Sequence, residues 1–256
     1  MSRTVWLFVF ALAAMVCLCS CRMSADSDSV STIVDGTTKV VVVTAGHGFE
    51  KEPFFAIFES LSNVEYAEAK QHDESEIFED ISGWDYDVIV LYNMTQHISP
   101  SRRANFIKLL EQGVGLVALH HSIGAFQDWP EYRKIIGGKY YLSARVEDGV
   151  KHEASTYKHG VNMTMQVEDR THPVTQGMSD FAIHDETYKN CVFEPDNHVL
   201  LSTEETTSDS SVCWARHYRK ARVCYIQLGH GPSAYTNSNY RRLVSQAISW
   251  CAAGKD

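Results

Sequence analysis

Short runs of apolar, mostly β-branched residues alternate with amphipathic stretches from Lys39 onward, and this alternation limits the chain to few folds. The first four runs are 39–44, 64–69, 87–92 and 115–120. Helices are expected from Pro53 and after Ser99-Pro100, a pair typical of an N-cap and a first helical residue. Runs without polar alternation are buried on both faces, and short strand–helix–strand connections give right-handed crossovers between parallel strands. The sequence therefore predicts an open, three-layer, mostly parallel α/β sheet.

The second half of the chain continues this pattern less regularly. A short helix is expected from Trp129-Pro130 to Gly137-Gly138, followed over 139–162 by an elaborated loop region with one or two strands. Further strands are predicted over 163–167, 199–202, 211–217 and 222–228, and a final helix from about Asn239. The last two of these strands are expected to form a hairpin around Arg219-Lys220. No internal repeat or second domain boundary is evident, so 38–253 is interpreted as one domain.

The first twenty residues differ in kind from the rest. Arg3 precedes an uncharged apolar run, 5–18, that is short for a bilayer span and is typical of a signal peptide. The ending Leu18-Cys19-Ser20-Cys21 resembles the lipobox of bacterial lipoproteins, in which Cys21 would become the lipidated first residue. An ordinary secretory signal is the alternative. Residues 21–37 are then a flexible tether, and the expected location is the bacterial cell envelope, outside the cytoplasm.

Charge and cysteine content exclude several classes of protein. Lys and Arg total 23 against 32 Asp and Glu, a net charge of −9 that disfavours a nucleic-acid partner. Four cysteines lie beyond the leader, without a CxxC or zinc-ribbon spacing. Of these, Cys213 and Cys224 stand in apolar runs and are expected to be buried thiols.

Histidines follow several of the predicted strands. His47 comes after the first strand, His120 and His121 after the fourth, and His230 after the last. Because the carboxyl ends of parallel strands meet at one edge of an α/β sheet, we expect a shared polar site there. For each histidine taken alone, a loop or core side chain with one hydrogen bond remains the alternative.

An acidic pair, Asp185-Glu186, is the second candidate feature. Adjacent carboxylates commonly lie on an exposed, solvated loop. This pair stands between apolar residues 181–183 and Tyr188, which favours at least one inward-pointing carboxylate. Such a group can orient a histidine or act as a base.

A nucleophile elbow is not evident after the fourth strand. That turn carries His120-His121-Ser122, without the small residue that would relieve strain two positions before the serine. Covalent acyl-enzyme chemistry is disfavoured, and proton transfer or metal-bound water is favoured, because imidazole can serve both.

An ordered set of motifs resembles the ThuA-like (trehalose utilisation) family over about 38–253. The motifs are 42–47, 113–121, 129–132 with Gly137-Gly138, 172–177, 185–188, 214–216 and 222–230. The resemblance implies a flavodoxin-like sheet of the class I glutamine amidotransferase superfamily, with His120 or His121 where amidotransferases carry cysteine. It also implies a role in the use of trehalose or related disaccharides, with oxidised 3-keto-sugars as substrates. The Gly-Lys-Gly usual before the last strand is Arg219-Lys220-Ala221 here.

The sequence thus predicts a membrane-tethered, carbohydrate-active enzyme that hydrolyses or isomerises a keto-glycoside. The expected catalytic residues are His47, His120, His121, Asp185, Glu186 and His230. Their individual roles stay open, as does a divalent metal such as zinc, which imidazole and carboxylate ligands suit. The alternative is a non-catalytic sugar-binding or scaffold lipoprotein. A glutamine amidotransferase is not expected, because no cysteine stands at a strand-to-helix turn. The expected partner is a small carbohydrate, with membrane contact only through the lipid on Cys21.

Overall fold

A computed structural model describes Met1 and residues 36–72, 74–147 and 149–254 of the chain. The described residues from 36 onward belong to one compact unit. The expected signal peptide, Cys21 and nearly all of the expected tether lie outside the described residues. Among the described helices, none is long and apolar enough to cross a bilayer.

A nine-stranded sheet forms the centre of the domain, in the order β2-β1-β3-β4-β13-β12-β11-β8-β9. The first five strands of that order run parallel, and the remaining pairings are antiparallel. The strands are β1 (Thr38–Ala45), β2 (Val64–Lys70), β3 (Val88–Asn93), β4 (Gly115–Leu119), β8 (Thr156–Val167), β9 (Phe181–Lys189), β11 (His198–Ser202), β12 (Ser211–Tyr218) and β13 (Ala221–Ile226). The predicted α/β class is confirmed, and its parallel part has the flavodoxin-like order.

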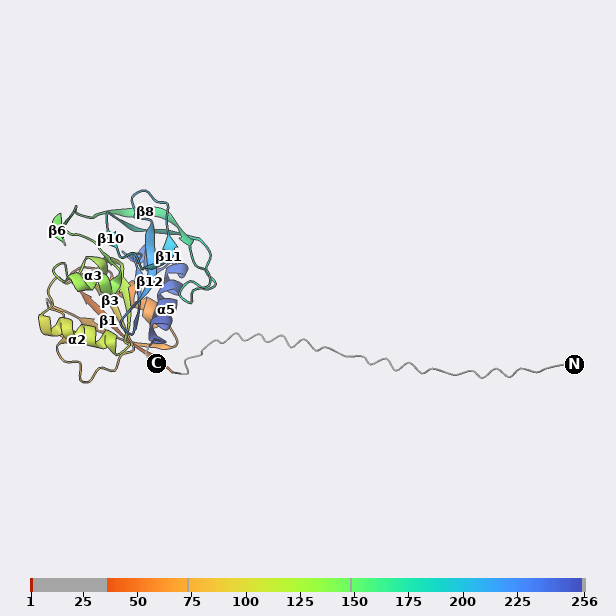
Figure 1. Ribbon diagram of the computed structural model, residues 1–256, viewed down its shortest axis with the longest axis horizontal. Coiled ribbons are helices and arrows are strands. Elements are labelled where there is room, and N and C mark those ends of the chain that lie inside the picture. Colours follow the sequence, from red (N-terminus) through yellow and green to blue (C-terminus); the bar gives the residue numbers. More distant parts are fainter. Residues whose placement is uncertain (2–35, 73, 148, 255–256) are drawn as a thin grey trace. The chain divides into compact units, whose positions relative to one another are not determined.

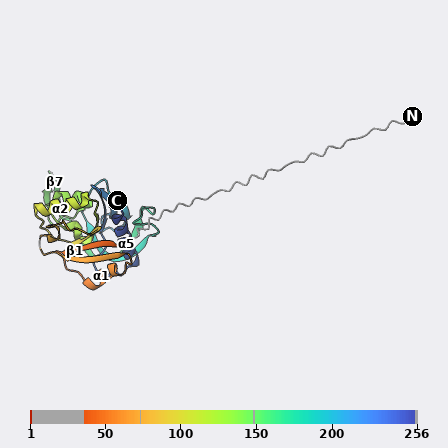
Figure 2. The same cartoon turned by 90° about the horizontal axis from the view of Figure 1, so that it is seen from below.

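Helices cover both faces of this sheet. One face carries α1 (Lys51–Glu59), α4 (Pro232–Tyr235) and α5 (Ser238–Ala252), and the other carries α2 (Pro100–Glu111) and α3 (Pro130–Ile136). Figure 2 shows α1 and α2 on opposite sides of β1. Each face has its own hydrophobic core. Within β1, Val40 and Val42 point into the core under α1, α4 and α5, and Val41 and Val43 point into the core under α2 and α3. Strands buried on both faces explain the continuous apolar runs of the sequence.

The irregular middle of the chain contains more strand than the sequence predicted. Residues 139–162 contribute β5 (Gly138–Lys139), which pairs with β10 (Val192–Phe193), and a small hairpin of β6 (Arg145–Glu147) and β7 (Val150–His152). The predicted strand over 163–167 is the end of β8, which begins at Thr156. Figure 1 shows β8 passing across the top of the domain.

The acidic pair lies on a strand that the sequence analysis did not predict. Asp185 and Glu186 belong to β9, where only 3% and 5% of each residue is exposed, so the exposed-loop alternative is wrong. Alternation places successive β9 side chains on opposite faces. The side chains of Asp185 and Glu186 therefore point to opposite faces of β9 and contact different groups.

Several turns agree with the prediction in detail. The Ser99 side chain accepts a hydrogen bond from the Arg102 N–H at the start of α2, as an N-cap does. The β12–β13 hairpin turns at Arg219-Lys220, where Arg219 takes a φ of 55°. The departure from Gly-Lys-Gly thus leaves the hairpin intact, with arginine in a left-handed conformation that glycine adopts more easily.

Candidate functional site

His120 stands at a strained turn between β4 and the 3-10 helix η2 (His120–Gly124). The predicted strand 115–120 ends at Leu119, and His120 takes a φ of 48°. The Tyr225 hydroxyl donates to the His120 carbonyl at 2.9 Å, and the His120 ring is fixed by a 2.6 Å contact from Nδ1 to the Gln227 carbonyl. A non-glycine residue with positive φ is costly unless its surroundings hold it. The turn therefore has the geometry of an elbow, with imidazole at its tip.

The loop after β13 is held from both sides. Gly229 has a φ of 115°, a conformation open chiefly to glycine. The Asp185 carboxylate accepts from the N–H of Gly229 at 2.7 Å and from the N–H of His230 at 3.0 Å. The Tyr92 hydroxyl donates to the Gly229 carbonyl at 2.8 Å. Asp185 is thus a positioning residue for His230.

Glu186 is aligned with an irregularity in β8. Lys158 pairs with Thr187 and Val161 with Asp185, so His159 and Gly160 together oppose Glu186. Such a bulge inserts one extra residue and redirects its neighbours, and Gly160 allows it with a φ of 66°. As a result His159 lies beside the site, with Nδ1 3.6 Å from Glu186 Oε1.

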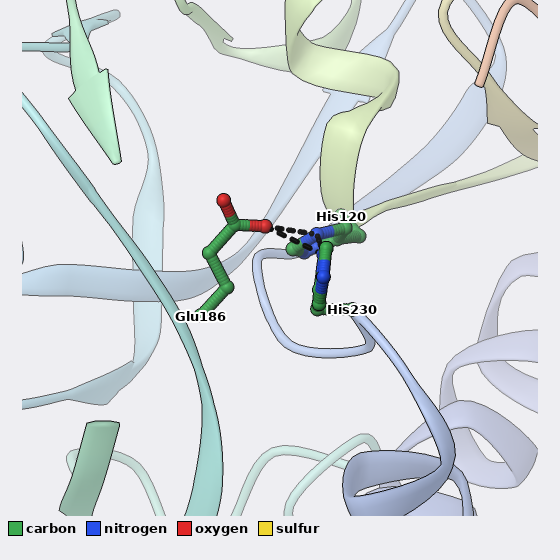
Figure 3. A group of neighbouring side chains, drawn as sticks. All are labelled: His120, Glu186 and His230. Atoms are coloured by element: carbon green, nitrogen blue, oxygen red, sulfur yellow. Dashed lines mark hydrogen bonds and ion pairs between the residues drawn. The ribbon is translucent and has the colours of Figure 1, made fainter. Parts of the chain in front are cut away.

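Three side chains from separate segments meet at one point (Figure 3). Glu186 Oε2 lies 3.0 Å from His120 Nε2 and 2.7 Å from His230 Nδ1. The two imidazole nitrogens are 3.3 Å apart. The Tyr188 hydroxyl also lies 2.9 Å from His120 Nε2. We refer to His120, Glu186 and His230 as the triad.

The triad is electrostatically coupled. Burial alone would raise the pKa of the Glu186 carboxyl, but hydrogen bonds from His120 and His230 outweigh it and lower the pKa to about 2. The hydrogen bond to Glu186 raises the pKa of His230 in turn. Glu186 is therefore an anion at neutral pH, and it faces groups that favour its charge.

His47 and His121 form a second pair beside the triad. Their rings stack with centroids 4.6 Å apart, and His121 also contacts the Tyr92 ring at 4.3 Å. Desolvation by burial lowers the pKa of both histidines, most strongly that of His121. His121 is only 4% exposed, and neither of its ring nitrogens has a hydrogen bond of good geometry among the described residues. An approach to the Tyr92 backbone offsets only part of the effect of burial on its pKa.

A cavity of about 200 Å³ opens in front of these groups. Imidazole, carboxylate and phenol groups share its wall with aliphatic side chains. The lining is His47, Met94, His121, Ile123, Gly124, Tyr140, Leu142, Tyr157, His159, Glu186 and Tyr188. Tyrosine rings beside polar groups are a surface on which a sugar ring can stack and hydrogen-bond.

The structure brings all six candidate residues of the sequence analysis to this place. Two histidines that precede the acidic pair in the sequence, His172 and His184, lie elsewhere: His172 packs on Trp250, and His184 contacts Asn162. His159 and the cavity tyrosines were not predicted. Alternation of Phe181, Ile183 and Asp185 was the available signal for β9, whereas nothing in the sequence located the bulge that presents His159.

Asp185→Asn is expected to weaken the hold on the His230 loop. An amide keeps one acceptor but turns an NH₂ group toward a backbone N–H, so one buried donor loses its partner at a cost of about 1–3 kcal/mol. Urea unfolding would measure this loss. Asp128→Asn is the control, because Asp128 forms an exposed ion pair with Arg145 and should change stability by less than about 1 kcal/mol. Equal stabilities of the two variants would contradict the positioning role.

The parallel sheet order and the strained turn after β4 together define a class I glutamine amidotransferase-like fold with histidine at its elbow. PurLQS from Thermotoga maritima shares this fold at 14% identity, with a TM-score of 0.50 over 84% of this chain and 99% of the other. The chain belongs to the ThuA (trehalose utilisation) family, whose model matches residues 39–251.

Two other solved structures, both described as ThuA-like proteins, also resemble the chain. One from Parabacteroides merdae is 18% identical, with a TM-score of 0.73 over 86% of this chain and 91% of the other. One from Bacteroides uniformis is 19% identical, with a TM-score of 0.60 over 87% of this chain and 94% of the other. A search of curated proteins finds no match. The structural likenesses support the fold, and the family links the chain to trehalose utilisation.

Proposed function

We propose that the protein is an enzyme that cleaves or isomerises a keto-glycoside related to trehalose. The observation that carries this proposal is His121, a buried imidazole in the wall of a tyrosine-lined cavity, whose ring nitrogens have no well-formed hydrogen bond within the described part of the chain. Unsatisfied buried polar groups are rare and call for a functional or structural reason. A sugar bound in the cavity would give His121 a hydrogen-bond partner.

The proposed reaction starts with proton abstraction. A ketone at C3 acidifies the hydrogen on C2, and His121 accepts that proton, which leaves an enolate. The enolate electrons then form a C1–C2 double bond while the C1–oxygen bond breaks, and the departing oxygen takes a proton. Water adds back across the double bond to complete hydrolysis.

Other groups around the cavity suit the remaining proton transfer. His159 is 57% exposed at its side chain and lies in the cavity wall, so it can donate to the departing oxygen and recover a proton from solvent. His47 stacks on His121 and keeps its ring in place. The amidotransferase alternative lacks support, because His120 occupies the elbow and none of the four described cysteines lies there.

Comparison of an oxidised and an unoxidised disaccharide tests this proposal. The purified protein should release monosaccharide from 3-keto-trehalose, or isomerise it, and should leave trehalose unchanged, because only the ketone acidifies C2. Chromatography of the products measures both. Thermal stabilisation by the keto-sugar without any product would instead support the sugar-binding alternative. Absence of both binding and turnover with 3-keto-disaccharides would contradict a carbohydrate function.

We also propose that the protein is exported and anchored by a lipid on Cys21. The apolar run 5–18 and the ending Leu18-Cys19-Ser20-Cys21 support this proposal. In a bacterial host, labelled palmitate should enter the full-length chain and should not enter Cys21→Ser. Cys17→Ser is the matched control within the leader and should keep the label. Equal labelling of both variants, or none of the wild type, would contradict the anchor.

A further inference from the structure

We propose that the triad of His120, Glu186 and His230 binds one divalent transition-metal ion, with zinc as the best match. The proposal concerns binding by the protein alone. It rests on the proposed function only for what the ion would do to a substrate.

The spacing of the donor atoms supports a single ion. His120 Nε2, Glu186 Oε2 and His230 Nδ1 are 2.7–3.3 Å from one another. Three atoms this far apart can all lie about 2.0–2.2 Å from one point, which is the length of zinc bonds to imidazole nitrogen and carboxylate oxygen. Among the described residues, this is the group of three such donors that meets within metal-binding distance.

The hydrogen bonding of His120 prepares it as a ligand. A carbonyl oxygen can only accept, so the 2.6 Å contact with Gln227 places a proton on His120 Nδ1. In the neutral ring of this tautomer, an ion at the centre of the triad would take the Nε2 lone pair in place of the hydrogen bond that Nε2 forms with Glu186. Metal-binding histidines commonly have this outer hydrogen bond to a carbonyl. The Tyr188 hydroxyl lies 2.9 Å from the same nitrogen and would have to turn away when an ion binds.

The other two ligands are equally constrained. His230 is positioned by the Asp185 carboxylate through its backbone N–H, and Glu186 is opposite the bulge in β8. Three separate segments therefore present their donors from fixed backbones. Rigid presentation of this kind lowers the entropic cost of binding an ion.

The ligand types select among metals. Two imidazoles and one carboxylate suit zinc and related transition ions, whereas magnesium and calcium prefer oxygen ligands throughout. Three protein ligands also leave a fourth tetrahedral position open, as catalytic zinc sites do. Because Glu186 belongs both to the triad and to the cavity wall, that position can take a carbonyl oxygen of a bound keto-sugar.

Metal content and cobalt spectra test the site without any activity assay. The protein is purified without a histidine tag, stripped with a chelator and titrated with zinc by calorimetry. We expect one ion per chain, and with cobalt(II) a visible absorption band typical of tetrahedral coordination. Glu186→Gln and His230→Ala should each weaken zinc binding more than about 100-fold, beyond the loss expected from an outer-sphere change.

His198→Gln is the matched control. His198 Nε2 lies 3.0 Å from Asp169 Oδ2, an imidazole–carboxylate pair that no third metal donor joins among the residues that the structure describes. This variant should bind zinc as the wild type does, and circular dichroism should show that all variants are folded. No stoichiometric ion in the wild type, or undiminished binding by folded Glu186→Gln and His230→Ala, would overturn the proposal. Zinc binding without turnover of keto-sugars would leave the metal site standing and contradict the proposed function instead.

Discussion

His121→Gln is expected to lower turnover of a 3-keto-disaccharide at least about 100-fold, the range that a positioned general base contributes. Glutamine is of similar size and neutral, so it can occupy the place beside His47 and Tyr92. Its amide is not a base, and the proton on C2 of the substrate then has no acceptor at this position. Steady-state rates on the keto-sugar measure the effect, and the loss should fall on kcat more than on KM.

Two comparisons separate this effect from a general disturbance. His198→Gln removes an exposed imidazole that does not line the cavity and should keep wild-type turnover. The thermal unfolding temperature of His121→Gln should stay near that of the wild type, since the substitution breaks no well-formed hydrogen bond to the residues that the structure describes. Wild-type turnover in folded His121→Gln would remove His121 from the reaction.

Gly229→Ala is expected to cost about 2–4 kcal/mol of unfolding free energy, from strain and a steric clash together. At a φ of 115° a Cβ is strained in any case, and here it would lie 2.3 Å from the Tyr240 hydroxyl. Relief of the clash would move the loop that carries His230. Urea unfolding should show the lost stability, and turnover should fall with it.

Substitution of Tyr240 isolates the part of the lost unfolding free energy that is due to the hydroxyl contact. The Tyr240 hydroxyl is buried without a partner among the described residues, so Tyr240→Phe alone should be neutral or slightly stabilising. In the double variant the hydroxyl contact is removed, while the backbone strain and a 2.9 Å approach to the Tyr240 ring Cζ stay, so only part of the cost, about 0.5–3 kcal/mol, should be recovered. A Gly229→Ala protein within about 0.5 kcal/mol of the wild type would contradict the tight fit of this loop.

The parallel half of the fold could be predicted from the sequence because its signal is strong. Each strand is a continuous apolar run, and both cores receive alternate residues of strands such as β1. The same regularity allowed His47, His120, His121 and His230 to be placed at one edge of the sheet. The carboxyl ends of the strands lie close together because of the parallel sheet topology, and no local sequence motif is needed to predict this.

The antiparallel part of the sheet was harder to predict, because strands such as β9 bury polar side chains as well as apolar ones. In the sequence, adjacent acidic residues such as Asp185 and Glu186 are typical of a solvated loop. Their burial in β9 is explained by hydrogen bonds to Gly229 and His120, which are distant in the sequence. His159 was missed because a bulge depends on the register between two strands. The strain at His120 was missed for a related reason, since Tyr225 and Gln227 stabilise that turn from another strand and loop.

Hydrogen exchange at C2 of the sugar tests the central role of the cavity most directly. The wild-type protein is incubated with a 3-keto-disaccharide in deuterium oxide, and the sugar is followed by NMR. Deuterium should enter at C2 at least as fast as product forms, and His121→Gln should abolish this incorporation. Product formation without any deuterium at C2, or the same incorporation in wild type and His121→Gln, would contradict proton abstraction by His121.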